Sequence, residues 1–189
     1  MSLYEIVGVA FGAVAVWLTV RENIWCWPTG LVNVGLFIVV FYRARLYADM
    51  GLQVVYVALC LYGWYAWLHG GRDHGALRVS RTPSRVLSVT LVLVAGAGLV
   101  LGLALRRHTD ASLPFWDSAT TSGSLAAQWM QTRKWIENWV VWIAVDVVYV
   151  GVYLYKDLYL TAALYAVFLV LAVMGLVKWK KTLGATGAA

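Results

Sequence analysis

Charged residues are scarce in this sequence, and their scarcity excludes a soluble globular domain. Only 13% of the 189 residues are charged, whereas 62% are hydrophobic. The hydrophobic residues form several runs that are long enough to cross a bilayer as α-helices. We therefore predict an all-α polytopic membrane protein that is surrounded by membrane lipid.

The net charge of +6 does not indicate a nucleic-acid partner. Lys and Arg cluster between the apolar runs, where such residues set membrane topology and contact anionic lipid headgroups. We therefore expect no nucleic-acid binding.

Cysteine and histidine are rare as well. Cys26 and Cys60 have no CxxC spacing, and the histidines at positions 69, 74 and 108 fall between the predicted helices. The chain also lacks the GxSxG and HExxH motifs of hydrolases and any motif for nucleotide hydrolysis. We expect the cysteines to serve packing, and we expect no metal site, no cofactor and no enzymatic activity.

Seven transmembrane helices are predicted, and one of them is too polar to be identified by hydropathy. The apolar helices span 3–20, 24–42, 50–68, 86–105, 138–155 and 158–178, and the polar helix spans 115–132. Residues 69–85, between the third and fourth helices, are polar and basic. We expect them to form an exposed connector.

The polar helix is identified by an internal repeat. Tyr47 and Tyr159 are 112 residues apart, and the same offset pairs Trp27 with Trp139 without gaps. The repeat predicts two three-helix units, at 1–71 and 113–189, separated by a connector and a linker helix at 72–112. Because the linker is a single helix, both units enter the membrane in the same direction, which makes a 3+1+3 parallel repeat.

Basic residues predict the orientation of the chain in the membrane. Lys and Arg divide between the two sides as five against ten, and the richer side is expected to be cytoplasmic. This places the N-terminus outside and the C-terminus in the cytoplasm.

An acidic residue lies in the middle of an apolar helix. At helical spacing, Asp146 shares one face of 138–155 with Asn138, Trp142 and Tyr149, and Trp139 lies beside that face. A carboxylate at the centre of a membrane helix costs roughly 2.5 to 3.5 kcal/mol on insertion scales. It is therefore expected to face protein, water or a ligand, and we predict a binding site on this face.

A second polar stripe follows the helix 115–132, where Asp117, Thr121 and Gln128 share a face. Gln53 and Asn33 supply buried amides from the first half. Thr121 is equally suited to bonding its own helix backbone, and Asp117 to capping a helix or gating. For Asp146 three roles remain open: a protonated packing residue, a proton carrier, or the counter-charge of a cationic ligand.

The tryptophans are expected to divide between lipid and ligand. Trp139 and Trp142 are predicted ligand contacts. Trp17, Trp67, Trp129 and Trp179 are predicted to anchor the chain at the membrane interfaces.

Four spaced motifs complete the pattern. They are the NWVVW run at 138–142, an LY pair in each half, a terminal GxxxW in each half, and Gln53 six residues after the first LY pair. Together they resemble the PnuC family of bacterial vitamin transporters. The resemblance covers nearly the whole chain, and it implies binding roles for Asn138, Trp139, Trp142 and Gln53.

The resemblance also implies a function. It implies facilitated uptake of nicotinamide riboside across the bacterial inner membrane, with phosphorylation inside the cell trapping the substrate. The implied architecture is similar to that of the SWEET sugar transporters, and related folds suggest a homotrimer.

Elementary chemistry agrees with that substrate without selecting it uniquely. Nicotinamide riboside carries a cationic pyridinium ring that suits aromatic faces, and the absence of Lys or Arg within the spans counts against a phosphorylated substrate. Three alternatives stay open. They are the same fold carrying thiamin, riboflavin or a deoxynucleoside, a proton-coupled symporter using Asp146, and a membrane enzyme using Asp117 and Asp146 as paired carboxylates.

Overall fold

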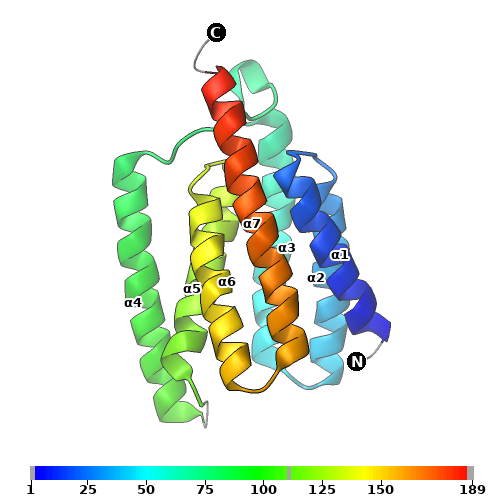
Figure 1. The fold of residues 1–189 in the computed structure, drawn as a ribbon, viewed down its shortest axis with the longest axis vertical. Coiled ribbons are helices and arrows are strands. Elements are labelled where there is room, and N and C mark those ends of the chain that lie inside the picture. Colours follow the sequence, from blue (N-terminus) through cyan, green and yellow to red (C-terminus); the bar gives the residue numbers. More distant parts are fainter. Residues whose placement is uncertain (1–2, 110–111, 187–189) are drawn as a thin grey trace.

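Seven α-helices make up most of the described chain, which covers residues 3–109 and 112–186 of this computed structural model (Figure 1). They are α1 (Leu3–Val20), α2 (Cys26–Arg43), α3 (Tyr47–His69), α4 (Ser84–His108), α5 (Pro114–Thr132), α6 (Asn138–Tyr155) and α7 (Tyr159–Thr186). The bounds of α1 and α6 agree with the prediction, whereas α7 continues well beyond its predicted end at residue 178. The predicted ends of the outer units, residues 1–2 and 187–189, lie outside the described residues.

Six of these helices are long and apolar enough to cross a membrane, and within the described residues α5 is not among them. Most hydroxyl groups of α5 are buried, and those of Ser118, Thr120 and Thr132 bond to the backbone of their own helix. Ser118 donates to the carbonyl oxygen of Phe115 at 3.1 Å, and Thr120 to that of Trp116 at 2.9 Å. A polar helix is tolerated at membrane depth when its polar groups are satisfied and covered by protein. The chain is therefore an all-helical, multi-pass membrane protein.

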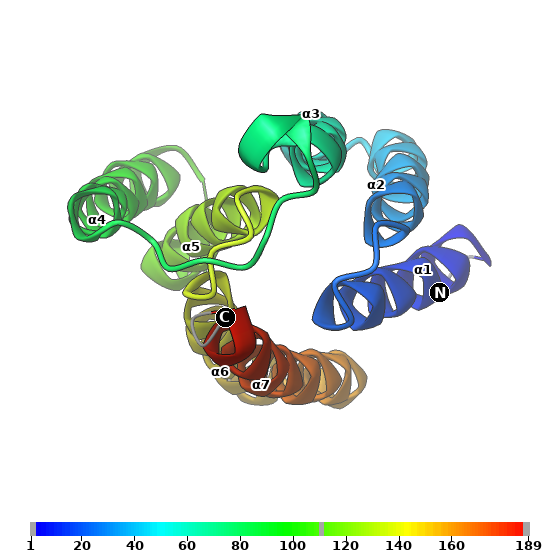
Figure 2. The same cartoon turned by 90° about the horizontal axis from the view of Figure 1, so that it is seen from above.

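The helices surround a common centre, apart from α4 (Figure 2). Neighbours within α1–α3 and within α5–α7 pack on each other, and two contacts between distant segments close the ring: α1 packs on α7, and α3 packs on α5. The start of α1 and the end of α7 lie at opposite ends of the bundle (Figure 1).

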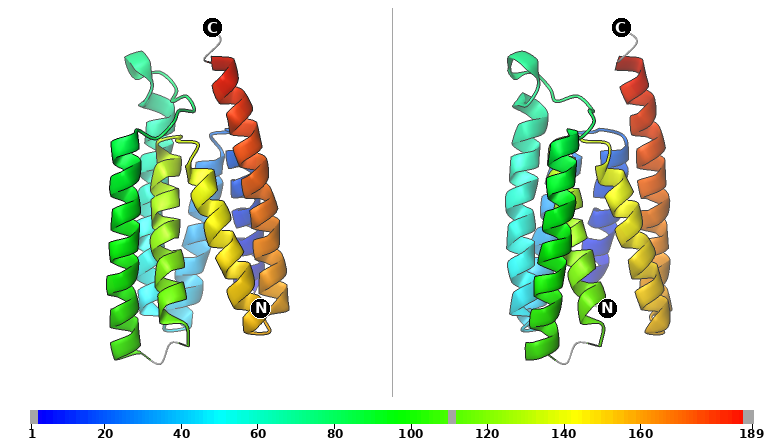
Figure 3. Two further views of the ribbon diagram at one scale, coloured as in Figure 1. Left: turned by 60° about the vertical axis from the view of Figure 1, so that its left-hand side comes forward. Right: turned by 90° about the vertical axis from the view of Figure 1, so that its left-hand side faces the viewer.

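Helix α4 lies outside the ring and packs against α5 (Figure 3). Many of its apolar side chains are exposed, Val92 at 71% and Val100 at 68% among them. Its small residues face α5 instead, where Gly98 and Gly102 are buried. An apolar exposed face of this kind suits contact with lipid.

Turns at corresponding places have matching backbones. Glu22, between α1 and α2, and Lys134, between α5 and α6, have φ angles of 56° and 54°. Arg45 and Asp157, in the next turn of each half, have φ angles of 58° and 57°. These left-handed conformations are uncommon for residues other than glycine, so their occurrence at paired positions reflects the same turn geometry in both halves.

Four buried tryptophans form a continuous chain of ring contacts near the end of the bundle where α7 terminates. Trp27 meets Trp67 edge to face at 5.3 Å, Trp139 meets Trp179 edge to face at 5.4 Å, and Trp67 meets Trp179 at 6.1 Å. All four side chains are at most 3% exposed. We refer to Trp27, Trp67, Trp139 and Trp179 as the tryptophan chain.

The prediction that Trp67 and Trp179 anchor the chain at the membrane interface is therefore wrong. In each GxxxW motif the glycine faces a tryptophan of the neighbouring helix, because a Cβ at Gly63 would collide with the ring of Trp27 and one at Gly175 with the ring of Trp139. In each GxxxW motif the glycine leaves room for an indole from the neighbouring helix. The tryptophan four residues later supplies a second indole from the same helix face. The motif packs the core rather than meeting lipid.

The segment between α3 and α4 is only partly exposed, which corrects the prediction of an exposed connector. The backbone of Ser80 pairs with the α5–α6 turn, accepting a bond from the amide of Ile136 at 3.0 Å and donating to the carbonyl oxygen of Lys134 at 3.1 Å. The carboxylate of Glu137 accepts bonds from the amide and the hydroxyl of Thr82 at 2.8 and 2.7 Å. These contacts fasten the connector across the end of the bundle.

The packing around the tryptophan chain predicts an asymmetry between two glycines. Gly175→Ala should lower the apparent melting temperature, because its added methyl group meets Trp139 and overpacking of this kind costs roughly 1 to 3 kcal/mol. Gly151→Ala in α6 is the matched control, since a Cβ there meets no atom within 4 Å. Thermal unfolding of the detergent-solubilised variants, followed by tryptophan fluorescence, measures both. Equal melting temperatures would contradict this description of the core.

Candidate functional site

A cavity of about 510 Å³ lies inside the ring of helices. Its lining comes from α1, α2 and α3 on one side and from α5, α6 and α7 on the other. Its volume is in the range of pockets that hold small molecules. The lining reaches Trp27 and Trp139 at one end and Asp49, which is exposed, at the other.

Seven of the ten predicted site residues line this cavity. They come from four helices and both halves of the chain: Asn33, Gln53, Gln128, Trp139, Trp142, Asp146 and Tyr149. Residues far apart in the sequence are thus brought to one space, with aromatic and amide side chains facing the same volume.

The predicted face of α6 turns toward this cavity. Trp142, Asp146, Tyr149 and Tyr153 follow each other at helical spacing, and all four contribute to the lining. Asp146 is only 4% exposed. A buried carboxylate needs a partner that satisfies its charge or hydrogen bonds, which makes the cavity beside it suited to a cationic or hydrogen-bonding ligand.

The charged side chains in the described lining are all acidic. Asp49 and Asp146 are the charged residues in the described lining, which contains neither Lys nor Arg. When ionised, the two carboxylates give the cavity a negative potential. Such a field attracts cations and disfavours anions.

The amide side chains of the cavity differ in how they are bonded. Asn33 donates through Nδ2 to the carbonyl oxygen of Gly8 at 2.7 Å and thereby joins α2 to α1. Gln128 makes only a long contact of 4.0 Å from Nε2 to the sulfur of Cys60. A weak contact of this kind is readily exchanged for a ligand. The side chain of Gln128 is therefore less constrained by its contacts than that of Asn33, which joins two helices.

Three predicted residues do not line the cavity. Asn138 is fully buried and donates from Nδ2 to the carbonyl oxygen of Trp135, at the start of its own helix. On α5 the lining begins at Ser124, so Thr121 and Asp117 lie about one and two turns beyond it, toward the beginning of the helix. These three residues therefore lie outside the cavity lining in this structure, and their contact with a ligand stays a prediction.

A cluster of aromatic side chains at the wall of the cavity joins the predicted Tyr149 to three residues that were not among the predicted site residues, Tyr153, Tyr165 and Phe168. The ring of Tyr165 on α7 lies 4.5 Å from that of Tyr149 and 5.2 Å from that of Tyr153, and Phe168 lies 5.8 Å from Tyr165. All four line the cavity. The signal in the sequence was slight, because α7 is apolar on every side and its periodicity does not mark an inner face.

The sequence profile of the family described as nicotinamide mononucleotide transporter matches residues 2–181. The chain belongs to this family, which includes the PnuC transporters. It is 30% identical to the nicotinamide riboside transporter PnuC of Escherichia coli K12, across 95% of this chain and 85% of that protein. It is 26% identical to the riboflavin/roseoflavin transporter RibM of Streptomyces davaonensis, across 93% of this chain and 83% of that one.

A solved structure has the same fold. The crystal structure of the vitamin B3 transporter PnuC superposes with a TM-score of 0.74 and 21% sequence identity, covering 96% of this chain and 82% of that one. The family is one of membrane transporters, which agrees with the prediction of a transporter rather than an enzyme. The alternative of a membrane enzyme with paired carboxylates also lacks its geometry, since Asp146 lines the cavity and Asp117 does not.

Proposed function

We propose that this chain carries nicotinamide riboside across the bacterial inner membrane by facilitated diffusion. The observation that carries the proposal is the lining of the cavity, which combines Trp142 and several tyrosines with Asp146 and no basic residue. A pyridinium ring is attracted to aromatic faces and to a carboxylate. The carboxamide and ribose hydroxyls match amides such as Gln53 and Gln128, which donate and accept hydrogen bonds. The relative in E. coli is named for this substrate.

The same lining favours the nucleoside over the nucleotide that appears in the family description. A phosphate group carries up to two negative charges and is usually held by Arg, Lys or exposed helix N-termini. The described lining offers two carboxylates and no basic side chain. Nicotinamide mononucleotide would therefore enter an unfavourable field.

Riboflavin is the second candidate, because the relative in Streptomyces davaonensis is named for it. Riboflavin has a neutral ring system and leaves the charge of Asp146 without a counterpart. Thiamin is cationic and would be attracted by the carboxylates of the cavity, whereas a deoxynucleoside carries no charge for them to attract. Competition between these compounds distinguishes the candidates.

We further propose that the chain is a 3+1+3 parallel repeat, as in the SWEET transporters. The units span 1–71 and 113–189, and 72–112 forms the connector and the linker helix. Support comes from α2 and α6, whose first and last residues are each 112 positions apart, and from the matching turns at Glu22 and Lys134. Rocking of the two units about the cavity would expose it to each side in turn.

The excess of Lys and Arg at one side supports an N-terminus outside and a cytoplasmic C-terminus. Phosphorylation inside the cell would trap the substrate. The exposed apolar face of α4 is available to lipid or to neighbouring copies in a homotrimer.

Uptake of labelled nicotinamide riboside into liposomes containing the purified protein tests the substrate and the mechanism together. We expect saturable uptake that ends at equal concentrations inside and outside. Unlabelled nicotinamide riboside should compete at least about tenfold better than the mononucleotide, because the phosphate lacks a partner in the cavity. Stronger competition by riboflavin, thiamin or a deoxynucleoside would reassign the substrate. Accumulation driven by an imposed pH gradient would instead support a proton symporter that uses Asp146.

Asp146→Asn tests the role of charge in the cavity. The substitution keeps the shape of the side chain and removes its charge, so the affinity for nicotinamide riboside should fall by about tenfold or more. Asp117→Asn is the matched control, because Asp117 does not line the cavity. Calorimetric titration of both variants in detergent measures the effect. Similar affinities for the two variants would mean that the carboxylate of Asp146 does not face the substrate.

A further inference from the structure

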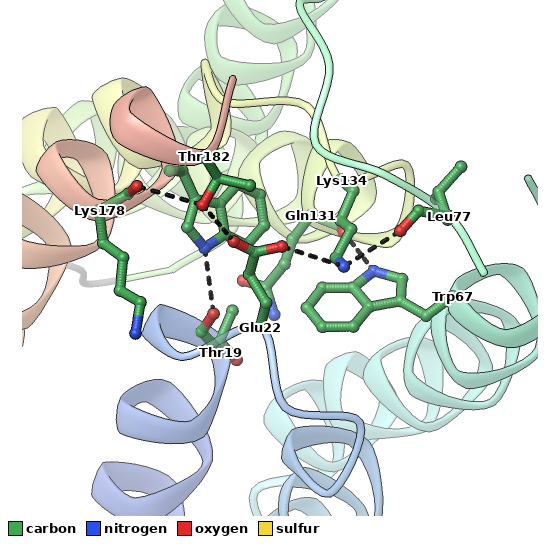
Figure 4. Close-up of polar contacts among 9 residues, drawn as sticks. Thr19, Glu22, Trp67, Leu77, Gln131, Lys134, Lys178 and Thr182 are labelled. Atoms are coloured by element: carbon green, nitrogen blue, oxygen red, sulfur yellow. Dashed lines mark hydrogen bonds and ion pairs between the residues drawn. The ribbon is translucent and has the colours of Figure 1, made fainter. Parts of the chain in front are cut away.

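One end of the cavity is closed by a layer of side chains that comes from both three-helix units. Thr19 and Gln131 line the cavity at the ends of α1 and α5, together with Trp27 and Trp139. The next layer, which continues toward the end of α7, contains Glu22, Trp67, Lys134 and Trp179 (Figure 4). We refer to these four residues as the gate layer.

Two indole groups of the gate layer bond across the units in a reciprocal manner. Trp67 of the first unit donates from Nε1 to the carbonyl oxygen of Gln131 in the second, at 3.0 Å. Trp179 of the second unit donates from Nε1 to the carbonyl oxygen of Thr19 in the first, at 3.2 Å. Both acceptors belong to residues that line the cavity, so each bond joins the cavity wall of one unit to a helix of the other.

An ion pair joins the same two units beside these bonds. The Nζ atom of Lys134 lies 3.3 Å from Oε2 of Glu22, and the side chains are 10% and 20% exposed respectively. Thr182 on α7 donates to the other oxygen of Glu22 at 2.8 Å. Lys134 also donates to the carbonyl oxygen of Leu77 in the connector at 3.1 Å and lies 4.5 Å from the ring centre of Trp67. Figure 4 shows these contacts meeting in one place.

The position of this pair follows from the proposed repeat. Glu22 and Lys134 are 112 residues apart and occupy the same left-handed position in their respective turns. The contact between them is thus a contact between equivalent turns of the two units. Identical charged residues at equivalent positions would repel each other, whereas opposite charges turn this contact into an attraction.

We propose that the gate layer is the gate that separates the cavity from the C-terminal side of the membrane, and that its ion pair must break for the substrate to pass. The proposal rests on the transport function proposed above. Trp67 and Trp179 are almost wholly buried and their rings lie 6.1 Å apart, so two large side chains of different units meet beside this end of the cavity. Besides the ring contact between Trp67 and Trp179, the contacts between the units here are an ion pair and hydrogen bonds, which water can replace when the units separate. A gate made of such contacts can open and close repeatedly.

The two native cysteines provide a direct readout of this gate. Cys26 and Cys60 both line the cavity, and both are free thiols. The probe is a membrane-impermeant, trimethylammonium-bearing methanethiosulfonate, added to membrane vesicles of either orientation. In the wild-type protein, labelling should be slow from the C-terminal side and faster from the opposite side. A variant with Cys26→Ala and Cys60→Ala gives the background.

Neutralising the ion pair should open the cavity to the C-terminal side. We expect Glu22→Gln and Lys134→Gln each to raise the rate of labelling from that side by about tenfold, because each shifts the balance between closed and open states. Lys181→Gln is the matched control, since Lys181 is an exposed residue of α7 outside the gate layer. The exchanged variant, Glu22→Lys with Lys134→Glu, should return the rate toward that of the wild type. The exchange tests whether the two charges act on each other, and thermal unfolding of the single variants shows whether the pair serves general stability instead.

Binding of nicotinamide riboside, titrated in detergent, separates this proposal from the proposed function. Glu22→Gln and Lys134→Gln should bind it within about threefold of the wild type, since neither residue lines the cavity. Unchanged labelling in both variants, or equal acceleration in Lys181→Gln, would overturn the gate. Should the single variants not fold, fast labelling of the folded exchanged variant would also overturn it. Absence of binding by the wild type would contradict the substrate instead, and the labelling rates would still decide the gate.

Discussion

The architecture depends on how two three-helix segments meet at one end of the bundle. There the tryptophan chain crosses from one segment to the other, with Trp67 and Trp179 in contact at the middle and each indole bonded to a carbonyl of the opposite segment. Four large aromatic side chains fit into this small region because Gly63 and Gly175 have no side chain to exclude them. Burial of these rings contributes apolar contact between the segments. The cavity begins directly beside this joint, so the same residues hold the bundle together and close the site.

The polar side chains that line the cavity must be covered by other helices so that they do not contact lipid. A helix as polar as α5 would be costly at membrane depth if it were exposed, but α3, α4 and α6 pack around it. This packing permits Ser124 and Gln128 to face the cavity opposite Asp146. The result is a space with aromatic walls, a few amides and a negative potential, between segments that are otherwise apolar. A small cation with polar substituents matches each of those properties.

Much of the fold could be predicted from the sequence, because apolar runs and regular residue spacings indicate the helices. The bounds of α1 and α6 follow from their apolar runs, and α5 was identified by its place in the repeat even though its hydropathy is low. The inner face of α6 was predicted because Trp142, Asp146 and Tyr149 stand out from an apolar background. The inner face of α6 could be predicted because a polar residue in a membrane helix is expected to face protein, water or a ligand rather than lipid.

The remaining features depend on contacts between helices, which the residue pattern of a single helix does not indicate. Trp67 and Trp179 were expected at the lipid interface, and only the approach of Trp27 to Gly63 and of Trp139 to Gly175 explains why they are buried. Tyr165 was missed because α7 is apolar all round, and the sequence did not indicate that Asn138 would lie outside the cavity lining with its amide nitrogen bonded to the start of its own helix. The proposed binding of nicotinamide riboside inside the cavity between the two segments can be tested by a structure of the complex. Density for the pyridinium ring is expected against Trp142, with Asp146 nearby. Ligand density outside the cavity, or none at saturating concentration, would contradict it.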